Sequence, residues 1–101
     1  MTSMKILIID RDELSAKLFA SKLVAEGHEV MVEPVKNEAI EKIEQGECFD
    51  IIFIDPSPMK DAMPIILNIR RAVPYYCYIM LMVSEDDGID RDKVLSMGCL
   101  L

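Results

Sequence analysis

The sequence predicts a small α/β domain built on a doubly wound parallel sheet. Short apolar runs, rich in β-branched residues, alternate along the chain with segments of helical spacing. Two of these runs, Ile6–Ile9 and Ile51–Ile54, lead directly into Asp10 and Asp55. Continuous apolar strands of this kind are typical of parallel sheets, whose two faces are covered by right-handed crossovers. We therefore expect a sheet with helices on both sides.

The composition limits the classes of function. The 101 residues suffice for one domain with a single core, and a hydrophobic content of 51% favours a folded chain. The net charge of -7 argues against a nucleic-acid surface, because phosphate binding needs a basic face. Cys48, Cys77 and Cys99 form neither a CxxC pair nor a Cys/His cluster, so we interpret them as reduced core residues. No apolar run is long enough for a signal peptide or a membrane span, and we expect a cytoplasmic protein.

The first half of the chain contains two strand and helix units. Ile6–Ile9 is the first strand, Asp12 is placed to cap the following helix, and Gly27 ends it. Glu29–Glu33 is a second strand near the edge of the sheet, and a second helix runs from about residue 37 to Gly46. Helical spacing predicts that these side chains face the core: Leu14, Leu18, Phe19, Leu23, Val24, Ala39, Ile40 and Ile43.

The second half continues the alternation. Ile51–Ile54 is the third strand, and Pro64 is expected to open a third helix that closes near residues 70–71. The longest apolar run, Tyr76–Val83, is a fourth buried strand. A short helix from about residue 90 to Gly98 follows, and residues 99–101 are interpreted as the start of a fifth strand. The inward residues of the short helix are expected to be Val94, Leu95 and Met97.

The natural topology for this alternation is a flavodoxin-like sheet of strand order 2-1-3-4-(5). Strands 1 and 3 are then neighbours, so Asp10 and Asp55 stand side by side at the carboxyl edge with Asp12 close by. Converging carboxylates repel one another, and their oxygens suit a hard ion such as Mg²⁺ beside a phosphoryl group. The other interpretation stays open: Asp55 and Asp12 can serve only as caps of a turn and of a helix.

The sequence resembles the receiver domains of two-component response regulators over essentially its whole length. Four segments carry the likeness: Lys5–Asp12, Gly27–Val30, Asp50–Asp55 and Met97–Cys99. The resemblance implies that Asp55 is the phosphoacceptor, that Asp10 and Asp12 form an acidic pocket, and that Asp10, Asp55 and the carbonyl of Ser57 bind Mg²⁺. It also implies a histidine kinase or phosphotransfer protein as partner. It implies no enzyme beyond a switch that promotes its own phosphorylation and dephosphorylation.

The sequence departs from the pattern of this family at several positions. Arg11 stands where the family has a second acid, and a guanidinium there could reach Asp55 and neutralise the pocket without a metal. Val83 falls at the position of the switch hydroxyl, with Ser84 one residue further on. The family's Lys-Pro pair and last helix are absent from residues 1–101, so we interpret the chain as a single receiver-like domain that is incomplete at its C-terminus. The edge of strand 4 is then open to a homodimer or another partner.

Three functions remain open at this point. The first is a phosphoaccepting signalling switch. The second is a degenerate receiver that acts as an interaction or dimerisation module without phosphorylation, as Arg11 and Val83 favour. The third is a flavodoxin-like enzyme or mononucleotide binder, which would need a phosphate-binding loop after strand 1, where the acidic residues 10–13 have the wrong charge.

Overall fold

The computed structural model describes residues 3–56, 59–83 and 90–101, without the side chains of residues 59–62. Strands and helices alternate through these ranges. The elements are β1 (Lys5–Ile9), α1 (Glu13–Ala25), β2 (Glu29–Glu33), α2 (Lys36–Glu44), β3 (Ile51–Ile54), α3 (Met59–Ala72), β4 (Tyr78–Leu81) and α4 (Arg91–Ser96). No helix within the described ranges is long and apolar enough to cross a membrane.

The strands form one parallel sheet in the predicted order, β2-β1-β3-β4. Next to β4, Leu100 makes an isolated parallel bridge with Met80. Its amide donates to the Ile79 carbonyl at 2.7 Å, and its carbonyl accepts from the Leu81 amide at 2.9 Å. These bonds are the predicted start of a fifth strand and cover part of the β4 edge. Homodimerisation through this edge stays a prediction, which light scattering at high protein concentration can test.

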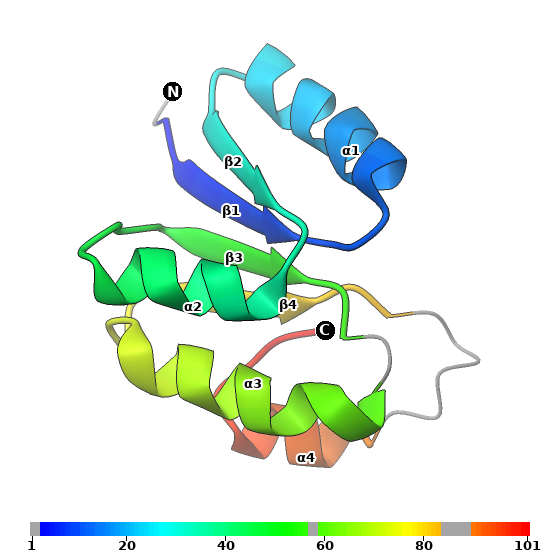
Figure 1. Ribbon diagram of the computed structural model, residues 1–101, viewed down its shortest axis with the longest axis vertical. Coiled ribbons are helices and arrows are strands. Elements are labelled where there is room, and N and C mark those ends of the chain that lie inside the picture. The colour runs from blue at the N-terminus through cyan, green and yellow to red at the C-terminus, as the bar shows by residue number, and fades with distance from the viewer. Residues whose placement is uncertain (1–2, 57–58, 84–89) are drawn as a thin grey trace.

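The two faces of the sheet carry different numbers of helices (Figure 1). Helix α1 lies on one face, and α2, α3 and α4 lie on the other. Alternate side chains of each strand therefore enter two separate cores. The larger core lies beneath α2, α3 and α4 and contains, from the strands, Leu7, Ile9, Ile52, Ile54, Ile79 and Leu81. The smaller core lies beneath α1 and is built around Ile6, Ile8 and Ala16.

The predicted inward face of α1 is wrong in part. Leu14, Leu18 and Val24 are exposed, with 71%, 59% and 56% of their surfaces accessible. Ala16 is buried instead, and Phe19 packs edge-to-face on Phe53 with ring centroids 4.9 Å apart. The apolar side chains of α1 lie on more than one face of the helix, and only one of these faces can pack on the sheet. The face that packs carries the small Ala16, which allows a close approach to the strands.

Helix α3 begins five residues before the predicted Pro64, which lies inside the helix on its exposed side. An interior proline removes one backbone hydrogen bond and costs about 3 kcal/mol. The full burial of Ile66 and Ile69 further along the same helix offsets this cost.

Three smaller expectations also fail. Strand β4 runs from Tyr78 to Leu81 and is therefore shorter than the predicted Tyr76–Val83. It is also not buried along its whole length, since 58% of the surface of Tyr78 is exposed. In α4, Val94 is buried and Met97 packs on the larger core as expected, but Leu95 is exposed. Of the cysteines, Cys48 is exposed, whereas Cys77 and Cys99 are free thiols in the core. Burial raises the pKa of the Cys77 thiol to about 11, which keeps it protonated.

The burial pattern predicts unequal effects of shortening two aliphatic side chains. Ile79→Ala removes atoms from the fully buried larger core and should lower the free energy of unfolding by about 2–5 kcal/mol. Leu18→Ala on the exposed face of α1 should change it by less than about 0.5 kcal/mol. Urea denaturation followed by circular dichroism measures both. Equal losses would mean that α1 packs on the sheet through its Leu18 side.

Candidate functional site

Two aspartates meet at the carboxyl edge of the sheet. In the parallel pair of β1 and β3, Ile9 lies opposite Ile54. The next residue of each chain segment is an aspartate, so the register brings Asp10 and Asp55 to the same place. The Asp55 amide donates to the Ile9 carbonyl at 2.9 Å, which extends the pairing beyond the end of β3. Both aspartates are half-buried. The carboxylates of Asp10 and Asp55 are therefore neighbours, as the predicted strand order requires.

The environment of Asp10 favours its neutral form. Partial burial is the main cause that raises the pKa of Asp10, and the negative charge and hydrogen bond of Asp55 raise it further. The Asp12 carboxylate adds a smaller repulsion in the same direction. The Asp12 amide, which donates to Asp10 Oδ1 at 2.9 Å, opposes these effects. The net effect on Asp10 is a raised pKa, so its surroundings favour binding of a proton or a cation there.

Asp12 is the N-cap of α1, as predicted. Its Oδ1 accepts from the Ser15 amide at 3.2 Å, and its Oδ2 accepts from the Ser15 hydroxyl at 2.8 Å. These bonds lower the pKa of Asp12, so it stays ionised while it caps the helix. Both carboxylate oxygens are engaged by the helix, and Asp12 contributes charge to the pocket rather than a ready ligand.

One contact in the pocket was not predicted. The bond from the Asp12 amide back to Asp10 is an Asx turn, which orients the Asp10 carboxylate across the strand end. The signal for it is present in the sequence, because an aspartate directly after a strand often accepts from the amide two residues further on.

The other predicted site residues contribute unequally. Arg11 is exposed, and the two ion pairs found within the described residues lie elsewhere, between Lys5 and Glu47 and between Lys42 and Glu33. Val83 is half-buried and packs against the larger core. Ser57 and Ser84 lie outside the described residues.

The donor set of the pocket fits Mg²⁺. Within the described part of the chain, no group of three or more Asp, Glu, His or Cys side chains converges on one point. Mg²⁺ is commonly held by only one or two carboxylates together with waters and phosphate oxygens. Asp10 and Asp55 supply two carboxylates, and their mutual repulsion favours a divalent cation. These are the residues that would hold the ion.

Comparison of the fold with solved structures gives consistent matches. The chemotaxis response regulator CheY4 of Vibrio cholerae is 21% identical, with a TM-score of 0.80 and coverage of 97% of this chain and 82% of CheY4. A two-component response regulator from Clostridium difficile is 26% identical, with a TM-score of 0.78 and coverage of 98% and 82%. Neither a family model nor a curated protein matches the sequence.

A third match contains a metal. The receiver domain of the sensor histidine kinase PA1611 from Pseudomonas aeruginosa, with magnesium coordinated in its active-site cleft, is 19% identical, with a TM-score of 0.76 and coverage of 99% of this chain and 84% of that domain. These likenesses show that the chain has the flavodoxin-like fold of response regulator receiver domains.

The raised pKa of Asp10 predicts a pH-dependent effect of Asp10→Asn. Because the pKa in the folded state lies above the ordinary value of 3.8, the stability contributed by Asp10 is present below that value and is lost as the pH rises through the folded-state pKa. The asparagine still accepts from the Asp12 amide but carries no charge. The variant should therefore be more stable than the wild type at pH 7, by up to about 1 kcal/mol, since water screens the half-exposed pair.

Urea denaturation at pH 7 and pH 3 measures this effect. At pH 3 the gain should shrink, because Asp10 is protonated in both states of the wild type. Glu41→Gln, at an exposed position on α2, is the matched control and should change little at either pH. A variant Asp10→Asn that is less stable than the wild type at pH 7 would contradict the account of the pair.

Proposed function

We propose that this chain is the receiver module of a two-component phosphorelay and accepts a phosphoryl group on Asp55. The observation that supports this proposal best is the adjacency of the Asp10 and Asp55 carboxylates at the carboxyl edge of a receiver-type sheet. In open α/β sheets this edge is where ligands bind. Phosphorylation would change the charge of the pocket and thereby switch contacts with a partner.

The proposed reaction transfers the phosphoryl group from a donor to one Asp55 oxygen. A new P–O bond forms as the P–N bond of a donor phosphohistidine breaks, and the imidazole leaves with the bonding electrons and takes up a proton. Asp10 stands beside the attacking carboxylate, and its oxygens would help to hold the cation. When bound, Mg²⁺ supplies the positive charge that offsets the two carboxylates and the transferring group.

A histidine kinase or a phosphotransfer protein is the partner that this chemistry requires. The exposed apolar side chains of Leu14 and Leu18 lie on the first turns of α1, which begins three residues after Asp10. Exposed apolar residues beside a reactive group favour a surface that a partner covers. A donor protein that packs on this part of α1 would bring its histidine close to Asp55.

The alternative is a degenerate receiver that serves as an interaction module without phosphorylation. Two observations favour it. Arg11 follows Asp10 at the position of the second acid in the family pattern, and the carboxylate of Asp12 is engaged as a helix cap. Fewer carboxylates at the edge mean weaker binding of a cation and slower phosphoryl transfer.

Incubation with a small acyl phosphate, followed by intact-mass spectrometry, distinguishes the two functions. The wild type should gain a single phosphoryl group only when Mg²⁺ is present. Asp55→Asn should abolish the adduct because the attacking oxygen is lost, and Asp10→Asn should slow its formation by at least about tenfold because one carboxylate of the proposed cation site is lost. Arg11→Asp should accelerate it, because a cationic side chain is replaced by a carboxylate.

Asp50→Asn, at the amino end of β3 and so at the other end of that strand from Asp55, is the matched control and should be phosphorylated at the wild-type rate. Circular dichroism of each variant establishes that it is folded. A folded wild type that forms no adduct, together with an Arg11→Asp variant that forms one, would support the degenerate receiver. An adduct that persists in Asp55→Asn would overturn the assignment of the phosphoacceptor.

A further inference from the structure

The side chain of Arg70 joins three segments of the chain at the amino edge of the sheet, where β4 begins. Arg70 lies in the last turn of α3. Its Nη2 donates to the Pro74 carbonyl at 2.6 Å. Its Nη1 donates to the Cys77 carbonyl at 2.9 Å and to the Gly98 carbonyl at 3.3 Å. One guanidinium therefore holds the connection between α3 and β4 and also the turn after α4.

The positive charge of Arg70 is bound by carbonyl groups. Neither of the two ion pairs found within the described residues includes Arg70. The last carbonyls of a helix carry partial negative charge, so a cation is favoured at the place where α3 and α4 both end. Burial raises the pKa of the Cys77 and Cys99 thiols, and the charge of Arg70 opposes this rise at both residues. The guanidinium thus acts on both connections at once.

The turn after α4 is shaped around the Arg70 side chain. Gly98 has a positive φ of 81°, a conformation that residues with a Cβ atom rarely adopt. A Cβ atom on Gly98 would lie 3.3 Å from Arg70 Cδ. The next residue, Cys99, is buried, and its amide donates to the Val94 carbonyl at 3.3 Å. A larger residue at position 98 would therefore displace the aliphatic part of Arg70.

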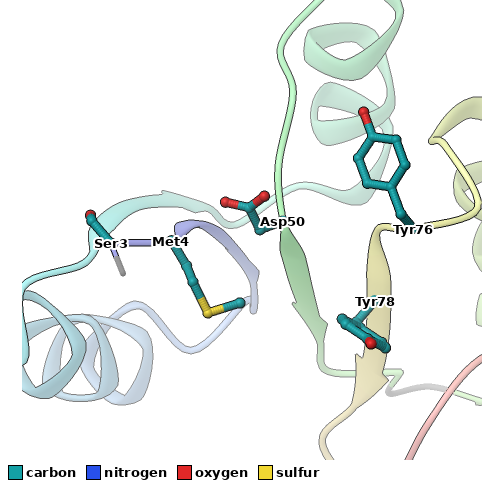
Figure 2. A pocket seen from close by; sticks show the side chains of 5 residues that line it. All are labelled: Ser3, Met4, Asp50, Tyr76 and Tyr78. Carbon is teal, nitrogen blue, oxygen red and sulfur yellow. The ribbon is translucent and has the colours of Figure 1, made fainter. Parts of the chain in front are cut away.

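The connection between α3 and β4 is anchored at Cys77. The Cys77 amide donates to the Pro74 carbonyl at 3.0 Å, the same oxygen that accepts from Arg70. Cys77 is 1% exposed, whereas its neighbours Tyr76 and Tyr78 are mostly exposed and line an open hollow at this edge (Figure 2). The residues beside Cys77 thus add little packing, and the bonds from Arg70 tie this connection to the turn after α4.

We propose that Arg70 and the carbonyls of Pro74, Cys77 and Gly98 form a clamp that makes the two connections open and close together. Because one guanidinium bonds to both, the bonds to Arg70 must break before either connection leaves its place. A planar guanidinium with five donors can bond to three carbonyls in fixed directions, which an ammonium does less well. The clamp lies at the other edge of the sheet from Asp55, so the proposal does not depend on phosphorylation.

Native-state hydrogen exchange of the ¹⁵N-labelled protein, followed by NMR, tests the clamp. In the wild type, the amides of Cys77 and Cys99 should share one opening equilibrium constant, larger than that of the β1 amides, because both exchange through the same local opening. Arg70→Met removes all three bonds, so both amides should exchange at least about tenfold faster, with opening constants that now differ. Arg70→Lys keeps the charge but should still accelerate both amides at least about threefold.

Arg71→Met is the matched control, because Arg71 is exposed and carries the same charge in the same turn of α3. It should change the exchange of both amides by less than about twofold. Gly98→Ala should accelerate the Cys77 amide as well as the Cys99 amide, because the displaced Arg70 side chain transmits the change to the other connection. Circular dichroism establishes that each variant is folded.

Three outcomes would overturn the proposal. The first is an effect of Arg71→Met equal to that of Arg70→Met, which would mean that only the charge at the helix end matters. The second is a difference between the opening constants of Cys77 and Cys99 in the wild type. The third is a Cys77 amide whose exchange Gly98→Ala leaves unchanged.

Discussion

The register of the β1 and β3 pair determines where the acidic side chains of this protein stand. Ile9 lies opposite Ile54, and both enter the larger core with no exposed surface. A slip of one residue would turn these side chains to the other face of the sheet, so packing of the core specifies the register strongly. The repulsion between Asp10 and Asp55 is thus imposed by the apolar residues before them. Partial burial at the strand end is the main cause that raises the pKa of Asp10, and this repulsion raises it further.

Strand β3 carries an aspartate at each end, and the surroundings give the two acids different properties. Asp55 shares its edge with a second carboxylate, which favours binding of a cation and transfer of an anionic group. Asp50 is held by backbone bonds to Lys5 and Tyr78, and its Oδ2 accepts from the Lys5 amide. The same short apolar strand therefore places one acid beside a second carboxylate and the other against backbone amides, at opposite ends of the strand.

The elements could be predicted because chain-local signals mark them, and the strand order and the acid pair then followed from the usual topology for alternating strands and helices. Apolar runs that end in aspartate, glycines after the helices and the cap at Asp12 each act over a few residues. The buried face of α1 could not be predicted, since Leu18 and Phe19 are equally apolar and only packing on Phe53 selects between them. The start of α3 was missed because Pro64 is a common first residue of a helix, and the burial that tolerates it inside α3 depends on distant strands.

Titration of the Asp10 and Asp55 carboxyl carbons by ¹³C NMR tests the account of the acid pair most directly. The account predicts that Asp10 titrates above its ordinary pKa of 3.8, that this pKa falls in Asp55→Asn, and that Mg²⁺ shifts the signals of both carboxyls together. If Asp10 instead titrates at or below the ordinary value and does not respond to Asp55→Asn, the two carboxylates do not act on one another. The proposed phosphoryl-accepting site would then lose its physical basis.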